Sequence, residues 1–419
     1  MSGVSTDSPR AAAGQGLLSG RAAVFVFLAF ALGYFSSALV RSVTATLSPV
    51  LTTEFQLQAG ELGLLAGGFF LGFASTQLPL GSWLDRFGPK RVVLSFMAVA
   101  VLACLAFSWA TSFTGLLIAR VLVGMGLSAG LMAPLTGFRR WYEPGQMLRA
   151  NSWMLMVGSM GMVASTLPVQ WLIPLLGWRP LFWIMAAMIL LSMALILRWV
   201  PAWPAAPAPG AEPHGGYGPI LRSRAFRRLV PMALFNYGGM VGLQTLWAGP
   251  WLTRVTGLSP AEAAQGLFFL NLAMLLAFWT WGLCTPALMR RGWHVDRLMR
   301  WCMPLSLALL IFNIAQGAQT GWVGWAAFCV LSSVMALAQP ALGMKFPASQ
   351  AGRALSAYNL VVFLGIFLMQ WGVGLLIDLA RSWGWSEVAS FQAAFCVYLL
   401  GCLAGYAYFV LSREDNPSP

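Results

Sequence analysis

Long apolar segments dominate the chain, and each is close to the length that crosses a bilayer. A helix rises about 1.5 Å per residue and the hydrocarbon layer is about 30 Å thick, so a span needs about 20 apolar residues. Twelve such segments are separated by polar breaks or breaks with proline and glycine: 22–50, 61–83, 91–110, 113–137, 150–173, 178–200, 229–253, 262–285, 299–317, 320–343, 355–378 and 389–411. The pattern predicts an all-α integral membrane protein with twelve transmembrane helices.

The longest interruption is the proline-dense segment 201–228, which we predict to be an irregular cytoplasmic linker. It divides the chain into six-helix bundles at 22–200 and 229–411, with cytoplasmic tails at 1–21 and 412–419. The halves also echo each other. A shift of 204 residues places Arg149 on Arg353 and Gly161 on Gly365, in the fifth helix of each half. This indicates an internal repeat, which is typical of transporter architectures.

Composition and charge exclude the common soluble classes. Hydrophobic residues make up 59% of the chain and charged residues only 9%, against roughly 25% charged in soluble domains. The net charge of +13 is spread in short clusters between apolar segments, which argues against a nucleic-acid groove. Of the 25 Lys and Arg residues, 20 fall on the side of the two termini and three on the other. This asymmetry predicts a cytoplasmic (inner) membrane protein with both termini in the cytoplasm.

The loop between the second and third spans carries the most specific motif. It reads Gly81-Ser-Trp-Leu-Asp85-Arg86-Phe-Gly88-Pro-Lys90-Arg91. It resembles the signature of the major facilitator superfamily in the same loop, with Pro89 where Arg is common. The resemblance implies two pseudo-symmetric bundles around one central site, alternating access and a functional monomer. It also implies a gating role, in which Asp85 bonds the positive N-terminus of the eleventh helix when the cytoplasmic side is shut.

A polar stripe on the first span contains a cation. Its members recur at spacings of three and four residues and share one helix face: Tyr34, Ser37, Arg41, Thr44 and Ser48. Such a stripe is expected to line a central aqueous cavity, where the planar guanidinium of Arg41 matches a carboxylate or phosphate. The alternative is an arginine that extends outward to the external interface.

The segment from Arg41 to Pro49, followed by Phe55-Gln-Leu and the Asp85 loop, resembles the organic anion:cation symporter branch. This implies that Arg41 contacts the substrate anion. That branch places acids just before this arginine and in the fourth helix, where this chain has Val40 and Leu127. Because proton coupling generally uses an intramembrane acid or histidine, three mechanisms stay open: anion exchange, downhill transport, or a proton carried on the substrate. Asp378, at the external end of the eleventh span, is the nearest candidate for coupling.

Arg120 lies within the fourth span, in Arg120-Val-Leu-Val-Gly124-Met-Gly126, a second pattern similar to the superfamily. An intramembrane arginine costs about 2.5–3.5 kcal/mol on insertion scales, so it is expected to face a cavity or a partner. Two roles stay open: coupling of transport, or a structural bond to backbone carbonyls.

The second half is expected to supply the opposite wall of the cavity. Two helix faces carry polar and indole groups: Asn236, Met240, Gln244, Trp247 and Trp251 on the seventh span, and Asn359, Phe363 and Gln370 on the eleventh. Amides and indoles offer hydrogen bonds to a ligand. We predict substrate contacts for Gln244, Trp247, Asn359 and Gln370. An interfacial belt is the alternative for the tryptophans.

Enzyme and metal chemistry are not indicated. The six cysteines lie in apolar segments without a CxxC pair, and no cofactor or metal site is predicted. Gly126-Leu-Ser128-Ala-Gly130 has the GxSxG form of serine hydrolases, but the two histidines, His214 and His294, fall in predicted cytoplasmic loops, and the serine lacks a base.

The sequence therefore predicts a secondary transporter of a small organic anion, with a carboxylate and uptake favoured, and with a proton or counter-anion as the coupling partner. The bilayer and the substrate are its expected partners. Two alternatives stay open: an amphiphile or drug exporter of the same superfamily, and a non-transporting membrane sensor on this scaffold.

Overall fold

The structure is a computed structural model that describes residues 17, 18, 20–203 and 216–412. Within these ranges the chain is helical and contains no strand. The predicted tails at 1–21 and 412–419 and the centre of the linker, 204–215, fall largely outside the described residues.

The first half of the chain forms a bundle of eight helical pieces. These are α1 (Gly20–Phe55), α2 (Ala59–Ser75), α3 (Gln77–Trp109), α4 (Phe113–Leu127), α5 (Met132–Trp141), α6 (Pro144–Ala164), α7 (Leu167–Leu176) and α8 (Trp178–Trp199). Six spans follow from them. The second is α2 with the first turns of α3, the fourth is α4 with α5, and the fifth is α6 with α7, bent by 44°.

The second half is more broken. It contains α9 (Gly218–Arg222), α10 (Arg224–Pro231), η2 (Met232–Gly238), α11 (Gly239–Gly242), η3 (Leu243–Trp247), α12 (Ala248–Pro250), η4 (Trp251–Val255), α13 (Pro260–Arg290), α14 (Val295–Gln316), η5 (Gly317–Gln319), α15 (Trp322–Ser332), η6 (Ser333–Leu337), α16 (Ala338–Met344), α17 (Ala348–Ser382) and α18 (Glu387–Leu411). The run from α10 to η4 is one span, the seventh, interrupted by three stretches of wide π turns at η2, η3 and η4. The linker differs from the predicted irregular chain, because α9 and the start of α10 lie within 218–228.

Among the described residues, nine helices are long and apolar enough to cross a membrane, or ten if α6 and α7 are one span. The shorter apolar α2, continued by α3, and the run from α10 to η4 complete the set. The twelve predicted segments are therefore all helical, and the all-α membrane fold is confirmed.

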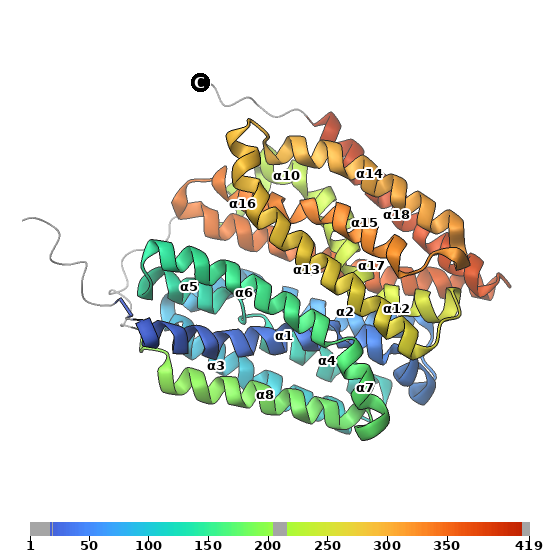
Figure 1. Ribbon diagram of the computed structural model, residues 1–419, viewed down its shortest axis with the longest axis horizontal. Helices are drawn as coiled ribbons and strands as arrows, with labels where there is room; N and C mark the ends of the chain where they lie inside the picture. Colours follow the sequence, from blue (N-terminus) through green and yellow to red (C-terminus); the bar gives the residue numbers. More distant parts are fainter. Residues whose placement is uncertain (1–16, 19, 204–215, 413–419) are drawn as a thin grey trace, which may run out of the picture.

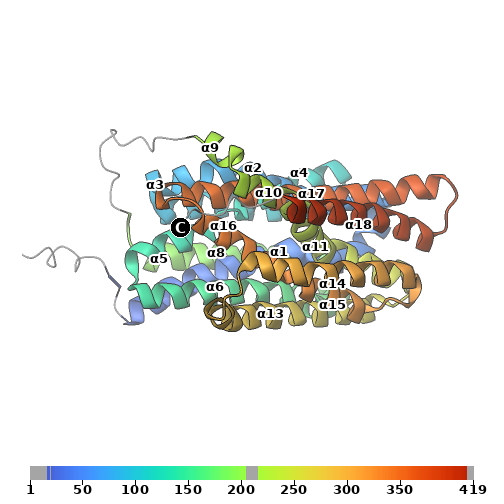
Figure 2. The ribbon, with the colours of Figure 1, turned by 90° about the horizontal axis from the view of Figure 1, so that it is seen from above.

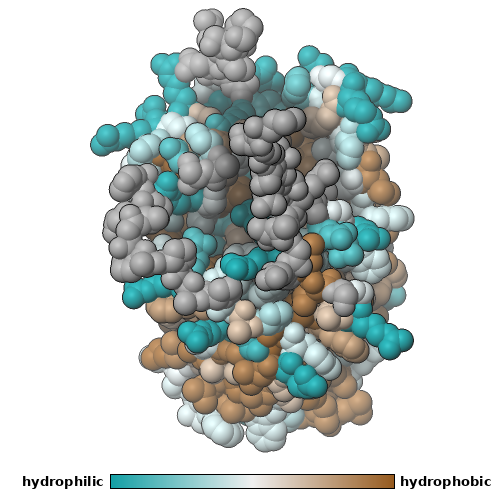
Figure 3. Space-filling view, turned by 90° about the vertical axis from the view of Figure 1, so that its left-hand side faces the viewer, coloured by the Kyte–Doolittle hydropathy of each residue, from teal (hydrophilic) through white to brown (hydrophobic). Residues whose placement is uncertain are grey.

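Figure 1 shows the two halves one above the other, α1 to α8 below and α13 to α18 above. We call the end where α1 begins the basic end, because Arg139, Arg140, Arg290 and Arg291 also lie at helix ends there, and the other end, where α1 finishes, the far end. Figure 2, turned by 90°, shows the helices running along the same long axis. Figure 3 faces the basic end, over which hydrophilic residues are spread.

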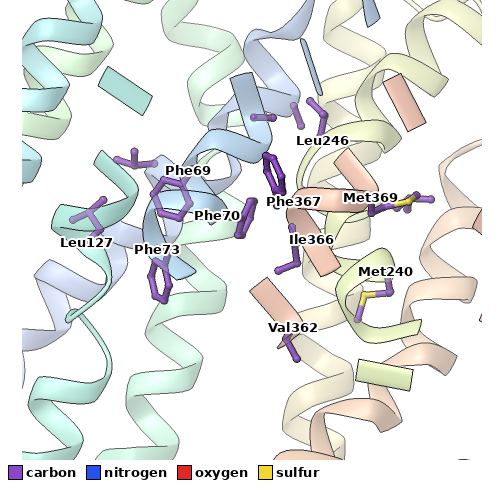
Figure 4. Packing of buried hydrophobic residues seen from close by; sticks show 14 of the residues in the cluster. Phe69, Phe70, Phe73, Leu127, Met240, Leu246, Val362, Ile366, Phe367 and Met369 are labelled. Atoms are coloured by element: carbon purple, nitrogen blue, oxygen red, sulfur yellow. The ribbon is translucent and has the colours of Figure 1, made fainter. Parts of the chain in front are cut away.

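The halves meet along α2 and α17, whose apolar side chains face each other in Figure 4. The rings of Phe73 and Phe363 lie 4.3 Å apart across this interface. A Cβ atom at Gly63 would collide with the backbone carbonyl of Gln370, so the two backbones touch directly. At the far end, the contact of α1 with α12 and α13 leaves a cavity of only about 10 Å³, room for one water at most.

The Gly81–Arg91 loop is a sharp turn inside α3. Gly88 has a φ of 78°, a conformation that favours glycine, and a Cβ atom there would overlap the ring of Trp203. Lys90 donates hydrogen bonds to the carbonyls of Leu197 (2.9 Å) and Val200 (2.7 Å) at the C-terminal end of α8. Gly88 and Lys90 of the motif thus contribute to helix packing at the basic end.

The crossing of α2 and α4 supplies a test of the packing. Gly124 on α4 lies against the carbonyl of Phe69 on α2, where a Cβ atom has no room. We expect Gly124→Ala to destabilise the fold by about 1–3 kcal/mol, because backbone must move to make space. Gly282→Ala on α13, where nothing lies within 4 Å of the added Cβ, is the control and is expected to leave thermal stability unchanged. Equal melting temperatures for the two variants would contradict this packing.

Candidate functional site

Arg41 lies in the middle of α1 and is partly exposed, although it is surrounded by transmembrane helices. Its only hydrogen-bond acceptor in the described part of the chain is the Sδ atom of Met162 on α6, 3.6 Å from Nη2. The Nε atom is buried and has no partner. No carboxylate of the described residues lies within ion-pair distance. A cation therefore stands in the core with only a weak thioether contact.

Tyr237 is the tyrosine that interacts electrostatically with this cation, and two further tyrosines lie close to Tyr237. Tyr237 lies within electrostatic reach of both Arg41 and Tyr34, and Tyr358 lies within reach of Tyr237. Tyr358 is 1% exposed, and its hydroxyl has no partner. Tyr34 comes from the first half, whereas Tyr237 and Tyr358 come from the second, so the group spans the interface between the halves.

Glycines bring these helices together. Gly238 on η2 lies against the carbonyl of Val362, and Gly365 on α17 lies against the carbonyl of Leu234. This reciprocal contact packs η2 onto α17 and places Tyr237 near Tyr358. The π turns of η2 also rotate successive side chains away from α-helical spacing, and such turns are frequent at functional sites.

On the other side of the site, Gly158 of α6 leaves room for the ring of Tyr34, since a Cβ atom would overlap it. Gly161 lies against the carbonyl of Phe35 and lets α6 approach α1 closely. The same approach brings Met162 to the guanidinium of Arg41.

Arg120 is bound quite differently from Arg41. It is 1% exposed and donates hydrogen bonds to the carbonyls of Val40 (2.9 Å) and Arg41 (3.2 Å). A third goes to the hydroxyl of Thr44 at 2.6 Å, and its guanidinium lies 5.2 Å from the centre of the Phe69 ring. Of the two roles predicted for Arg120, this geometry favours the structural one, because it fixes the backbone that carries Arg41.

The remaining predicted contacts on α1 are engaged inside the first half. Ser37 is buried, and its hydroxyl is 3.5 Å from the carbonyl of Leu127. Thr44 is the acceptor of the Arg120 hydrogen bond. The structure thus places Tyr34 and Arg41 at the centre, whereas Ser37 and Thr44 point toward α4.

In the second half, two predicted contacts lie in the interior of the bundle. Trp247 and Gln370 are both 0% exposed. The indole of Trp247 donates to the carbonyl of Gln370 at 3.1 Å, and the Gln370 amide donates to the hydroxyl of Thr245 at 2.9 Å. Neither the cavity nor an interfacial belt describes Trp247, because it joins the seventh and eleventh spans.

The two other predicted contacts, Gln244 and Asn359, are amides that each form a hydrogen bond with another amide side chain. Gln244 donates to Asn271 at 2.9 Å, with both side chains buried. Asn359 is partly exposed and accepts from Gln339 at 2.8 Å. Of Gln244 and Asn359, only Asn359, the residue after Tyr358, retains accessible surface.

Tyr237 and Tyr358 lie outside the helix faces predicted from the sequence. The predicted face of the seventh span runs through Asn236, but Asn236 donates to the carbonyl of Cys402 and faces α18. The neighbouring Tyr237 lies within electrostatic reach of Arg41. The available signal was the tyrosine itself, since a hydroxyl within a span needs a partner and the chain has only 8 tyrosines.

The gating residues lie at the basic end. Asp85 is exposed and makes no hydrogen bond in the described ranges, and Arg139 on α5 is the cation that faces it. Gly81 is open to solvent, Arg86 lies over the ring of Phe87, and Arg91 is exposed. The predicted bond from Asp85 to the eleventh span is not formed in this conformation.

The described carboxylates all lie near helix ends, and none lies beside Arg41 or Arg120. They are Glu54, Glu61, Asp85, Glu143, Glu262, Asp296, Asp378 and Glu387. No group of three metal-ligating side chains occurs among the described residues. The centre therefore offers one cation, hydroxyls and apolar surface to a ligand.

The comparisons with known proteins agree with this architecture. The sequence profile of the Major Facilitator Superfamily matches residues 30–370. The chain belongs to this superfamily. It is accordingly a multi-pass membrane transporter and not an enzyme, and the resemblance seen in the Asp85 loop is confirmed.

Curated relatives are distant and differ in what they carry. Multidrug resistance protein D of Escherichia coli (strain K12) is 28% identical over 49% of this chain and 52% of its own length. The 4-hydroxybenzoate transporter PcaK of Pseudomonas putida is 29% identical over 37% of this chain and 35% of its own. The 3-(3-hydroxy-phenyl)propionate transporter of Escherichia coli (strain K12) is 27% identical over 62% and 60%. The chain spans between 35% and 60% of the length of these relatives.

Solved structures cover nearly the whole fold. A bacterial homologue of the human lysosomal transporter Spinster, in an inward-facing and unoccupied conformation, aligns with a TM-score of 0.76 at 19% identity, over 94% of this chain and 98% of that one. A D-xylose–proton symporter aligns with a TM-score of 0.73 at 15% identity, over 94% and 99%. At these identities the likeness shows the fold.

The two intramembrane arginines are expected to respond oppositely to removal. Arg120→Leu deletes three hydrogen bonds and is expected to lower the free energy of unfolding by roughly 2–4 kcal/mol. Arg41→Leu removes an unpaired cation and is expected to leave stability unchanged or raised by about 1 kcal/mol. Thermal unfolding of both purified variants measures this. A loss at Arg41 as large as at Arg120 would show that Arg41 is also a structural residue.

Proposed function

We propose that this protein moves a small organic anion, with a carboxylate group, across the cytoplasmic membrane by alternating access between its two halves. The basic end faces the cytoplasm in this proposal, in line with the positive-inside distribution, and uptake is the favoured direction. The observation that carries the proposal is the unpaired guanidinium of Arg41 at the centre of the bundle.

The energetics of the two arginines support an anionic ligand. A charge within a span costs several kcal/mol unless it finds partners or water. Arg120 has three hydrogen-bond acceptors, but Arg41 has a single thioether contact. A substrate carboxylate accepts two parallel hydrogen bonds from the planar guanidinium, and so satisfies Arg41 in a way that the protein alone does not.

The surroundings of Arg41 favour a carboxylate with an apolar or aromatic body. Tyr34 and Tyr237 are partly exposed and offer rings together with hydroxyls, and Asn359 adds an amide. In this proposal Tyr34 and Arg41 contact the ligand from the first half, and Tyr237 contacts it from the second. Relatives named as carriers of 4-hydroxybenzoate and of a hydroxyphenylpropionate are compatible with such a ligand.

A second candidate function is the export of drugs or amphiphiles, which is favoured by the similarity to multidrug resistance protein D. Its difficulty is electrostatic. Lipophilic cations are repelled by Arg41, and no acid of the described residues stands nearby to attract them. The remaining alternative, a membrane sensor that does not transport, is excluded if the protein produces solute flux in liposomes.

Coupling to protons through a central acid has no support in the described residues. We propose instead that a counter-anion is exchanged or that the proton travels on the substrate. In proteoliposomes, exchange predicts that internal anion accelerates uptake of external anion. The proton-on-substrate route predicts uptake driven by an inward pH gradient without any internal anion.

The substrate class is tested by thermal stabilisation of the purified protein. The panel contains aromatic and aliphatic carboxylates, sugar acids, organophosphates and lipophilic cations. A ligand at 100 times its dissociation constant is expected to stabilise the fold by about 2.7 kcal/mol. We expect a carboxylate to stabilise the parent protein and not Arg41→Gln, with Tyr237→Phe weaker than the parent.

The matched control is Arg381→Gln, which removes an exposed arginine whose guanidinium bonds the carbonyl of Trp385 at the end of α17. It is expected to respond to the ligand like the parent. Stabilisation by cations alone, equal in the parent and Arg41→Gln, would overturn the anion proposal and favour export.

A further inference from the structure

The two halves are joined at the far end by a carboxylate that caps a helix. Asp378, near the end of α17, accepts hydrogen bonds from the backbone N–H groups of Ala59 (3.0 Å) and Gly60 (2.6 Å). These two residues begin α2. Since α2 belongs to the first half and α17 to the second, this contact bridges the interface that must open during transport.

The contact is strong for a physical reason. The first N–H groups of a helix have no acceptor within the helix and carry its positive dipole end. One carboxylate that accepts two of them forms charge-assisted hydrogen bonds, which are about twice as strong as neutral ones. A second carboxylate, Glu61, bonds the N–H of Gln58 at 3.0 Å. Glu61 caps α2 from within its own half, whereas Asp378 caps it from the other half.

Close helix packing makes the contact depend on conformation. A Cβ atom at Gly60 would lie 2.8 Å from the Asp378 carboxylate, and one at Gly374 would collide with the carbonyl of Ala59. With Gly63 against Gln370, these glycines let the backbones of α2 and α17 touch. The side chain of Asp378 is short, so it reaches the α2 amides only while the backbones of α2 and α17 are in contact. Tilting the halves apart at the far end therefore breaks both hydrogen bonds.

The same pair of spans carries a second carboxylate at the basic end. Asp85 lies at the other end of the second span and in this conformation makes no hydrogen bond among the described residues. The two acids thus occupy opposite ends of one helix–helix interface, one from each half, and only Asp378 is engaged.

We infer that Asp378 is the latch that holds the far end closed, the counterpart of Asp85 at the basic end, and that the two latches engage alternately. Asp378 then sets the balance between the two access states, whatever the substrate is. Its charge matters through the α2 amides and not through proton transfer to the substrate. This role goes beyond the proposed anion specificity and stands or falls separately from it.

Hydrogen–deuterium exchange of the purified, ligand-free protein tests the latch, with Asp378→Asn as the main variant. Loss of the charge-assisted bonds is expected to raise exchange about tenfold in the first turn of α2 and in residues 374–382. Residues 83–91 and 350–358 at the basic end are expected to exchange more slowly, because that end closes as the far end opens.

Two variants make the test specific. Glu61→Gln weakens the α2 cap without crossing the interface, and is expected to change exchange only in the first turn of α2. Asp85→Asn removes the opposite latch, and is expected to slow exchange at the far end or leave it as in the parent. The inference is overturned if Asp378→Asn changes only the first turn of α2, as Glu61→Gln does. It is also overturned if Asp378→Asn leaves exchange unchanged at both ends. The same holds if Asp378→Asn and Asp85→Asn change exchange at each end in the same direction.

Discussion

The hydrocarbon of a bilayer offers no hydrogen bonds, and this constraint decides what each polar group in the bundle does. Backbone groups are satisfied by helices, and most polar side chains by neighbouring helices. Trp247 bonds the carbonyl of Gln370 and Gln244 bonds Asn271, so these residues join spans. Several buried polar atoms lack a partner, but Arg41 is the intramembrane cation whose guanidinium contacts only a thioether, at 3.6 Å, and whose Nε is unpaired. Under the proposed function, a substrate anion supplies the acceptor that this guanidinium lacks.

Arg120 shows how the chain keeps such an exception in place. Its hydrogen bonds to the carbonyls of Val40 and Arg41 fix the turn of α1 from which the Arg41 side chain departs. Two intramembrane cations so close together would repel each other strongly if both were unsolvated. The charge of Arg120 is stabilised by its hydrogen-bond acceptors. The charge of Arg41 is accessible to water because its side chain is partly exposed. Arg120 thus holds the backbone of α1, whereas the side chain of Arg41 keeps accessible surface.

The fold was predictable from the sequence because span length, loop charge and the Asp85 motif are properties of single segments. The site was predictable only in part. Arg41 stood out because a cation within a span always requires a partner. The polar stripe through Asn236, Gln244 and Trp247 did not identify the cavity wall, since a polar face can turn toward a cavity or toward another helix. The seventh span also contains π turns, one of which includes Tyr237, and a helical periodicity of 3.6 residues cannot anticipate which side chains such turns bring together. Asp378 stood out as an acid at a span end, but its partners are backbone amides more than 300 residues away in the chain, which no local pattern reveals.

The unpaired cation also bears on how binding drives the change between access states. During that change both ends of the bundle are closed, and the site contains less water. Enclosing Arg41 alone then costs the desolvation of a charge, whereas enclosing it with a bound carboxylate buries a hydrogen-bonded pair. A ligand shifts a conformational equilibrium only by its differential affinity for the two states. Under the proposed function, an anion on Arg41 therefore stabilises the closed state relative to the empty protein, and the occupied carrier changes state more readily than the empty one. Such a carrier exchanges one anion for another more easily than it returns empty. In the proposed mechanism, substrate binding is coupled to movement through the electrostatics of Arg41, and no carboxylate of the described residues lies beside it.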